Sequence, residues 1–260
     1  MMSSALSRGS PIAYLAGDDA RRTRELEAAL VHPDVKAIIA GRGGYGAMRV
    51  LERANLGPLV ESPRWIVGFS DVTALHLMAA AAGVASVHGP NVTGLGRASP
   101  ANRAAWMTAL ERPHAPVVWG GLRVVHAATG AASREVRGQV YGGNLALLEA
   151  MAASGRLAVP EGCVLMLEDI DERPYRVDRM LTALRLGGHL SKAAAIVLGG
   201  FTRCAPGAEG TTVEEVLAER THGLGVPVLS GAPFGHAEDN RAFVVGREAI
   251  VRGGEVVFPG

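Results

Sequence analysis

Short apolar segments alternate with amphipathic segments along the first hundred residues of this chain. Apolar runs at 35–40 and 64–69 predict buried strands, and the segments 18–30 and 71–83 carry apolar residues at helical spacing. Parallel strands need crossover connections, usually helices, so this alternation favours a mainly parallel sheet with helices on both faces. The chain is therefore expected to have an α/β fold.

The regular alternation stops after residue 110, where a segment rich in Gly, Pro and Ala carries only short β-like runs. We interpret 111–137 as a crossing between two domains. The N-terminal domain, 1–110, is expected to be a mainly parallel sheet flanked by helices, and the C-terminal domain, 138–260, a second α/β unit. The segment GGN at 142–144 predicts a glycine turn before a helix, and 243–258 predicts a closing antiparallel pair.

Composition excludes several classes of protein. The 260 residues carry a net charge of +1 and no concentrated Lys/Arg stripe, which argues against a nucleic-acid partner. The two cysteines, Cys163 and Cys204, are too few for a disulfide framework or a Cys-based zinc site. Neither a signal peptide nor a run of membrane-spanning length is present, so we expect a cytoplasmic protein without membrane contact.

The segment AIIAGRGGYGAM has glycines spaced G-x-G-x-x-G at 41–46, after an apolar run and before an expected helix. This is the dinucleotide-binding fingerprint, but the acid expected about twenty residues on is Glu61, in a Pro-flanked turn. Arg42 and Tyr45 would also crowd a pyrophosphate. Two other interpretations stay open: a tight turn that packs helix on strand, or backbone N–H groups that bind an oxyanion.

The segment GFSD places Ser70 where a buried strand turns into a helix. Such a turn lifts a hydroxyl above the sheet beside a helix N-terminus, as required of a nucleophile. The hydrolase motif G-x-S-x-G is not matched, because Val72 stands in place of its second glycine. The alternative is a simple helix N-cap.

A serine nucleophile needs a base, and the base needs an orienting acid. His236 is the best base, because it follows a buried strand in a loop shaped by Gly and Pro; His88 is possible but close to Ser70 in the same sheet. The remaining histidines are expected to be packing, loop or surface residues: His32, His76, His114, His126, His189 and His222.

Four acids in the segment EDIDE follow the buried strand CVLML, and the first of them is Glu168. The carboxyl end of a buried strand is where α/β proteins place functional groups, so an orienting acid is expected here. A metal site is the alternative, but no histidine lies at ligand spacing and HEXXH is absent. A solvated helix start is the other alternative.

Taken together and in this order, these segments resemble the LD-carboxypeptidases of serine peptidase family S66, the muramoyltetrapeptide carboxypeptidases, whose relatives include the microcin C self-immunity proteins. The similarity runs from about residue 14 to the C-terminus. It rests on the segments YLAGDDARRTRELEAAL, AIIAGRGGYGAMRVL, GFSDVTALH, HGP, GGNLALL, LEDIDERPYRVDRML, GGFTRC and GAPFGHAEDN.

The resemblance implies a catalytic triad in the chain order Ser, Glu, His. Ser70 of GFSD would be the nucleophile, Glu168 of LEDI the orienting acid and His236 of GHAEDN the base. The family's oxyanion hole would use the amide of Asp71 and one amide of the RGGYG loop, from Gly44 or alternatively from Gly43. Neither a metal nor an organic cofactor is implied.

The implied function is release of the terminal D-alanine from cytoplasmic murein tetrapeptides in peptidoglycan recycling, by a homodimer. An alternative is a self-immunity peptidase that cleaves a peptidyl-nucleotide, with specificity set by the crossing at 112–137 and its Trp119. Family members begin with a strand, a helix and a second strand where this chain has only residues 1–13. An N-terminally shortened, non-catalytic binding or dimerisation protein is thus the alternative of another class.

Overall fold

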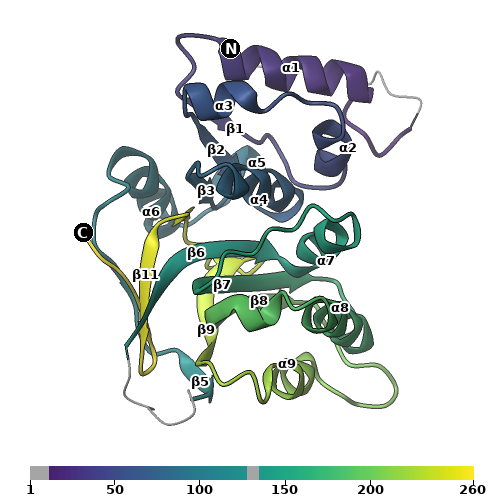
Figure 1. Cartoon of the computed structure of the whole chain (residues 1–260), viewed down its shortest axis with the longest axis vertical. Coiled ribbons are helices and arrows are strands. Elements are labelled where there is room, and N and C mark those ends of the chain that lie inside the picture. The colour runs from purple at the N-terminus through teal and green to yellow at the C-terminus, as the bar shows by residue number, and fades with distance from the viewer. Residues whose placement is uncertain (1–11, 128–134) are drawn as a thin grey trace.

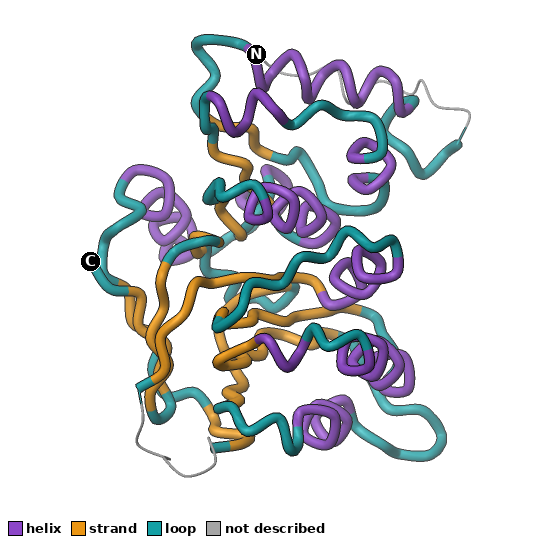
Figure 2. Tube along the Cα trace, viewed as in Figure 1, coloured by secondary structure: helices purple, strands orange, loops and turns teal. Residues whose placement is uncertain are grey.

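The computed structural model describes residues 12–127 and 135–260 and contains two β-sheets. The smaller sheet has four strands in the order β1-β2-β3-β10, and the larger has eight in the order β4-β12-β11-β6-β7-β8-β9-β5 (Figure 1). In Figure 2 the smaller sheet lies above the larger one, with helices beside both. The predicted α/β architecture with two sheets is confirmed.

The smaller sheet is built mainly from the first hundred residues, and its strands β1, β2 and β3 are parallel. Those strands are β1 (Ala37–Ile39), β2 (Trp65–Gly68) and β3 (Ser86–His88). The accompanying helices are α1 (Asp19–Val31), α2 (Ala47–Leu51), α3 (Gly57–Glu61), the 3₁₀ turn η1 (Ser70–Val72), α4 (Thr73–Ala81), α5 (Val92–Leu95) and α6 (Pro100–Glu111).

The larger sheet is parallel in its centre, from β6 to β9, and antiparallel towards both edges. Helices α7, α8 and α9 cover one face of its parallel part (Figure 1). The strands are β4 (Val117–Trp119), β5 (Arg123–His126), β6 (Val136–Asn144), β7 (Cys163–Ile170), β8 (Ala193–Thr202), β9 (Val228–Gly235), β11 (Glu248–Arg252) and β12 (Glu255–Phe258). The helices are α7 (Leu145–Ala153), α8 (Pro174–Leu186), the 3₁₀ turn η2 (Leu190–Lys192) and α9 (Val213–Thr221).

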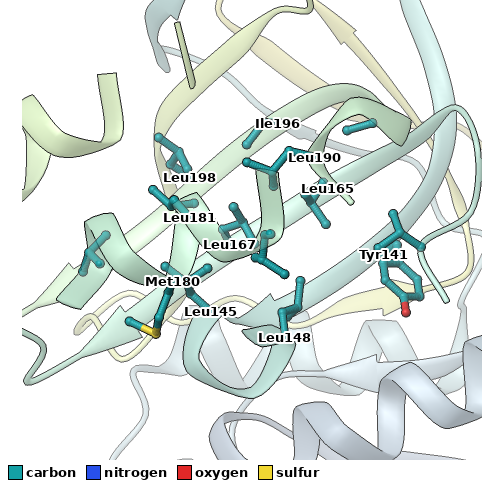
Figure 3. Close-up of a cluster of buried hydrophobic side chains, with 14 of the residues drawn as sticks. Tyr141, Leu145, Leu148, Leu165, Leu167, Met180, Leu181, Leu190, Ile196 and Leu198 are labelled. Atoms are coloured by element: carbon teal, nitrogen blue, oxygen red, sulfur yellow. The ribbon is translucent and has the colours of Figure 1, made fainter. Parts of the chain in front are cut away.

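Strand β7 shows why a strand at the centre of a sheet can be a continuous apolar run, here from Cys163 to Leu167. Leu165 and Leu167 pack against the helices, in the cluster drawn in Figure 3, whereas Val164 and Met166 pack on the opposite face. Successive side chains of a strand point to opposite faces, so a strand buried on both faces must be apolar at every position. Each such side chain contributes about 1.5–3 kcal/mol by leaving water.

The last strands divide between the two sheets. Strands β11 and β12 form the predicted antiparallel pair, with Ile250 opposite Val257. Strand β10 (Phe243–Val245) instead crosses to the smaller sheet, where Phe243 pairs with His88 of β3. The prediction that the whole segment closes the C-terminal domain was therefore wrong for β10, because strand pairing is chosen by distant partners.

The glycine turn predicted before α7 is also wrong. Gly142 and Gly143 lie inside β6, which runs directly into the helix. A Cβ at residue 142 would stand 2.3 Å from the Met166 carbonyl oxygen, and one at 143 would stand 2.7 Å from Thr73 Oγ1. These glycines therefore permit close approach of β6 to β7 and α4, which a local turn signal does not distinguish from a turn.

The expected crossing between domains contains two strands of the larger sheet, β4 and β5, which form its opposite edges. Residues 128–134 of the crossing, like 1–11 at the start of the first domain, lie outside the described residues. Trp119 is only 2% exposed and packs against Phe234, Phe243 and Phe258, so it belongs to the core rather than to a substrate-facing loop. The proposed domain boundaries stay a prediction.

Candidate active site

The parallel strands of both sheets carry polar groups at their carboxyl ends, where ligands bind in α/β proteins. The glycine motif follows β1 and Ser70 follows β2, while Asn144 ends β6. Glu168 lies near the end of β7, and His236 follows β9 directly. The predicted site residues are thus at strand ends, as their positions in the sequence indicated.

Ser70 has a strained backbone, with φ at +62°. A residue with a Cβ is disfavoured in this left-handed region by about 1–2 kcal/mol, and such strain is typical of functional turns. Gly68 permits the turn, because a Cβ at that position would stand 2.8 Å from Val72 Cγ2. The chain therefore rises abruptly from β2 into η1, which is the geometry of a nucleophile on a strand-to-helix turn.

The glycine motif lies directly against this turn. A Cβ at Gly43 would stand 3.0 Å from Ser70 Cβ and 3.2 Å from Ser70 Oγ, so only a glycine fits without displacing the serine. Gly44 has φ at +122°, a conformation that side-chain-bearing residues rarely adopt. The first part of the motif is bound by α5, since the amides of Val92 and Thr93 donate to the carbonyls at 40 and 41 at 3.0 and 3.2 Å.

A buried carboxylate and an imidazole form a close pair. Glu168 is 0% exposed, and its Oε2 accepts from His236 Nδ1 at 2.7 Å and from the His236 amide at 3.2 Å. An ionised carboxylate can only accept, so it holds the proton on Nδ1 and leaves Nε2 free to act as a base. Gly235, with φ at +99°, is required here, because a Cβ would stand 2.6 Å from Glu168 Oε2.

His236 reaches the turn at Ser70 by packing against Phe69. The centroids of these two rings are 4.7 Å apart, and Phe69 is the residue before Ser70. The chain after His236 continues to β10, which pairs with β3 beside β2, so the crossing strand brings the C-terminal pair to the N-terminal turn. Within the described residues, no hydrogen bond joins Ser70 and His236.

Asn144, to which the sequence analysis gave no role, and Asp169 of EDIDE complete the buried network. Asn144 Nδ2 donates to Asp169 Oδ1 at 3.0 Å and to Glu168 Oε1 at 3.3 Å, and its backbone amide donates to Thr73 Oγ1 at 3.1 Å. Asp169 also accepts from the Ala146 amide at 2.9 Å. Burial raises the pKa of Asp169 to about 6. The signal for Asn144 was present, since it is a polar residue at the carboxyl end of a buried strand.

His88 and His76 lie under the site but are not placed as bases. His88 is fully buried. Its ring centroid lies 4.7 Å from that of Phe243, in a stacked arrangement, and 6.2 Å from that of Phe69, in an edge-on arrangement. Burial, together with the nearby His76 and His236, holds the pKa of His88 well below the usual range. His76 bonds with the Ser86 hydroxyl at 2.8 Å and the Gly68 carbonyl at 2.9 Å, and burial lowers its pKa to about 4.

The remaining acids of EDIDE form ion pairs. Asp171 Oδ2 lies 2.6 Å from Arg203 Nη2, and this pairing lowers the Asp171 pKa. Glu172 Oε2 lies 3.4 Å from Arg176 Nη1. The described residues include no group of three or more His, Cys, Asp or Glu side chains arranged to hold a metal ion. None of the helices described is long and apolar enough to cross a membrane. The cytoplasmic location and the homodimer stay predictions.

A strained serine near a buried carboxylate–imidazole pair, on a two-sheet α/β fold, is typical of serine hydrolases. Family comparison agrees with this class. Residues 3–89 match the model of the LD-carboxypeptidase N-terminal domain, and residues 137–251 match that of the LD-carboxypeptidase C-terminal domain. The chain therefore belongs to the LD-carboxypeptidase family, S66.

Individual relatives support this assignment. A relative from Synechocystis sp. is 39% identical over 92% of this chain and 77% of its own length. The murein tetrapeptide carboxypeptidase of Pseudomonas aeruginosa is 35% identical over 92% of this chain and 80% of its own. The crystal structure of muramoyltetrapeptide carboxypeptidase from Oxalobacter formigenes superposes with a TM-score of 0.81, at 32% identity, covering 94% of this chain and 85% of that one.

The predicted relation to the microcin C self-immunity proteins is also confirmed. The Microcin C7 self-immunity protein MccF of Escherichia coli is 24% identical over 86% of this chain and 73% of its own length.

Proposed function

We propose that this hydrolase is a serine LD-carboxypeptidase that releases the terminal D-alanine from murein tetrapeptides during peptidoglycan recycling. Ser70 is the nucleophile, His236 the base and Glu168 the orienting acid. The observation that carries the proposal is the 2.7 Å bond between buried Glu168 and His236, whose ring packs on the residue preceding the strained serine.

The reaction begins when Ser70 Oγ attacks the carbonyl carbon of the scissile amide and His236 Nε2 takes the hydroxyl proton. Glu168 keeps the proton on Nδ1 and stabilises the imidazolium that forms. Collapse of the tetrahedral intermediate breaks the C–N bond, and His236 returns the proton to the departing D-alanine amine. Water then hydrolyses the acyl-enzyme by the same proton route and regenerates Ser70.

The tetrahedral oxyanion requires hydrogen-bond donors beside the nucleophile turn, the segment 68–71 that carries Ser70. The amide of Asp71 and an amide of the glycine motif, from Gly44 or Gly43, are the proposed donors. Contact between Gly43 and Ser70 supports this role, because it holds the loop beside the reacting atom. One such donor is worth about 10²–10³ in rate.

The murein substrate is supported by similarity to the Pseudomonas enzyme, whose name states that activity. Similarity to MccF favours a second candidate, cleavage of a peptidyl-nucleotide. Turnover of murein tetrapeptide should be compared with turnover of aspartyl sulfamoyl adenosine, a compound crystallised with MccF. Faster cleavage of the nucleotide compound would overturn the murein assignment while leaving the serine mechanism intact.

The test of the mechanism is mass-spectrometric detection of D-alanine released from purified murein tetrapeptide. Ser70→Ala should abolish release, whereas Ser62→Ala, at an exposed serine of the same domain, should keep it. A fluorophosphonate should label wild type at residue 70 only. Full activity of Ser70→Ala would refute the triad, and no adduct in folded wild type would favour the non-catalytic alternative.

A further inference from the structure

The carboxylate of Asp71 makes a contact that the proposed mechanism does not use. Its Oδ2 accepts from the Ala47 amide at 2.7 Å, across 24 positions of sequence. Ala47 begins helix α2, and the N-cap residue before it is Gly46, which has no side chain to cap the helix. The Ala47 N–H is one of the first four amides of the helix, which have no acceptor within it, and Asp71 supplies that acceptor from the nucleophile turn.

The same peptide group is held from its other side. Arg22 Nη1 donates to the Gly46 carbonyl oxygen at 3.1 Å, and that carbonyl and the Ala47 N–H belong to one planar unit. Arg22 is itself held by an ion pair, in which its Nη2 lies 2.5 Å from Asp19 Oδ1. The other oxygen of Asp19 pairs with Arg49 of α2. An acceptor and a donor at opposite ends of one peptide determine its orientation.

The need for glycine at position 46 follows from this arrangement. Gly46 has φ at +120°, and a Cβ there would stand 2.7 Å from Arg22 Nη1 and 3.0 Å from Leu15 Cδ2. A side chain would therefore displace the arginine from the carbonyl. This explains the third glycine of the motif without a dinucleotide.

Holding the peptide between residues 46 and 47 also restrains the amides at 43 and 44. Gly43 is against Ser70 at one end, and the held peptide lies only two residues beyond Gly44. Gly44 has no side chain to limit its own dihedral angles, so neighbouring contacts must set the direction of its N–H. Burial raises the pKa of Asp71, whereas the Ala47 and Gly46 amides and Arg22 favour its charged form.

We infer that Asp71 and Arg22 form a clamp on the peptide between Gly46 and Ala47, and that this clamp positions the amide at Gly43 or Gly44 for the oxyanion. Both side chains are positioning residues, a role separate from that of the Asp71 amide. The inference rests on the proposed serine mechanism and deepens it.

The first test measures the loop without substrate. Hydrogen–deuterium exchange of peptides covering 43–51 should be at least about tenfold faster in Asp71→Ala than in wild type, and intermediate in Asp71→Asn, which keeps one acceptor oxygen. Asp18→Asn is the matched control, because the Asp18 side chain caps α1 by accepting from the Arg21 amide at 2.8 Å and, within the described residues, makes no hydrogen bond to the glycine motif. Unchanged exchange over 43–51 in folded Asp71→Ala would overturn the clamp.

The second test separates positioning from general loosening. Asp71→Ala should lower kcat by about 10²-fold, with KM within a few-fold of wild type, because the oxyanion forms only in the transition state. Affinity for a peptidyl boronic acid, whose oxygen occupies the oxyanion position, should fall by a similar factor. Arg22→Met should act in the same direction, whereas Arg49→Met, which removes the other Asp19 pair, should not.

The outcomes distinguish the clamp from the enzyme assignment. If wild type releases no D-alanine, the proposed function fails, and the exchange rates still decide whether the clamp exists. If exchange rises in Asp71→Ala while kcat and boronate affinity stay at wild-type values, the loop is held but is not positioned for catalysis, and the inference is overturned.

Discussion

The proposed nucleophile turn at Ser70 and the proposed acid–base pair of Glu168 and His236 hold their groups by different means. At the turn, backbone conformation and close approach set the geometry: φ at +62° for Ser70, and Gly43 directly against it. At the pair, side-chain hydrogen bonds set it, because buried Glu168 accepts from His236 and from Asn144. One half of the site is made of main chain and the other of polar side chains.

The strands that carry the two halves explain this contrast. Strands β1, β2 and β3 have three or four residues each, and their ends are fixed by contacts between loops. Strands β6, β7 and β8 have eight to ten residues, and β7, at the centre of the three, is buried on both faces, so it can hold a carboxylate that has no access to water. An added side-chain atom should therefore lower activity most at the turn that carries Ser70, and removal of a charge should lower it most at the pair of Glu168 and His236.

The largest effect is expected from Glu168→Gln. The substitution keeps the size of the side chain but removes the charge, and its NH₂ group would favour the wrong imidazole tautomer. We expect kcat to fall by about 10⁴-fold, as when the orienting acid of a serine protease becomes an amide. Glu161→Gln, at an exposed acid just before β7, should change kcat little. A loss of less than tenfold at residue 168 would contradict the side-chain half of the comparison.

A smaller loss is expected from Gly43→Ala in the main-chain half. The added methyl would press on Ser70 Cβ at 3.0 Å and shift the loop, so kcat should fall by about 10²-fold or more, the value of one oxyanion donor. Gly41→Ala is the control, because its Cβ would meet nothing within 4 Å. Equal steady-state rates for the two variants would show that close approach at residue 43 is not required.

Gly235→Ala tests a position where both means act together, because the backbone conformation of Gly235 makes room for the Glu168 side chain. It should lower kcat by about 10- to 10²-fold by displacing Glu168 from a productive position. Gly231→Ala on the same strand has similar strain, at φ of +85° against +99°, but its Cβ would meet nothing. Both should lose about 1–2 kcal/mol of unfolding free energy in urea titrations. Equal kcat values in the Gly235→Ala and Gly231→Ala variants would show that the loss comes from backbone strain and not from contact with Glu168.

The smallest effect concerns Asp169, whose pKa is raised from 3.8 to about 6 by burial. Between those pH values the folded chain binds more protons at this site than the unfolded chain. Its contribution to stability is thus full below about pH 4 and lost as pH rises through 6. The free energy of unfolding of wild type minus that of Asp169→Asn should fall across this window, by at most about 1.4 kcal/mol per pH unit. If urea titrations give free energies of unfolding for the two proteins that run parallel from pH 4 to 6, the raised pKa of Asp169 is contradicted.

Much of this site was predictable because its signals are local. Apolar periodicity located the strands, and the residues at or just beyond their carboxyl ends included the proposed Ser70, Glu168 and His236. The position of Asn144 at a strand end was predictable. Its bonds to Glu168 and Asp169, and the contact of the Asp71 carboxylate with Ala47, were not, since each joins residues more than twenty positions apart. The glycines of β6 were misread for the same reason: what they approach is another strand.

The amino-acid sequence by itself determined where strands and helices form and which chemical groups stand at their ends, because hydrophobic period, turn residues and motif spacing act over a few residues. Tertiary structure alone decided that the chain after His236 returns as β10 to pair with β3, so that His236 lies against Phe69. Strand partners are selected by burial and by backbone hydrogen bonds between distant segments, and no local pattern encodes that choice.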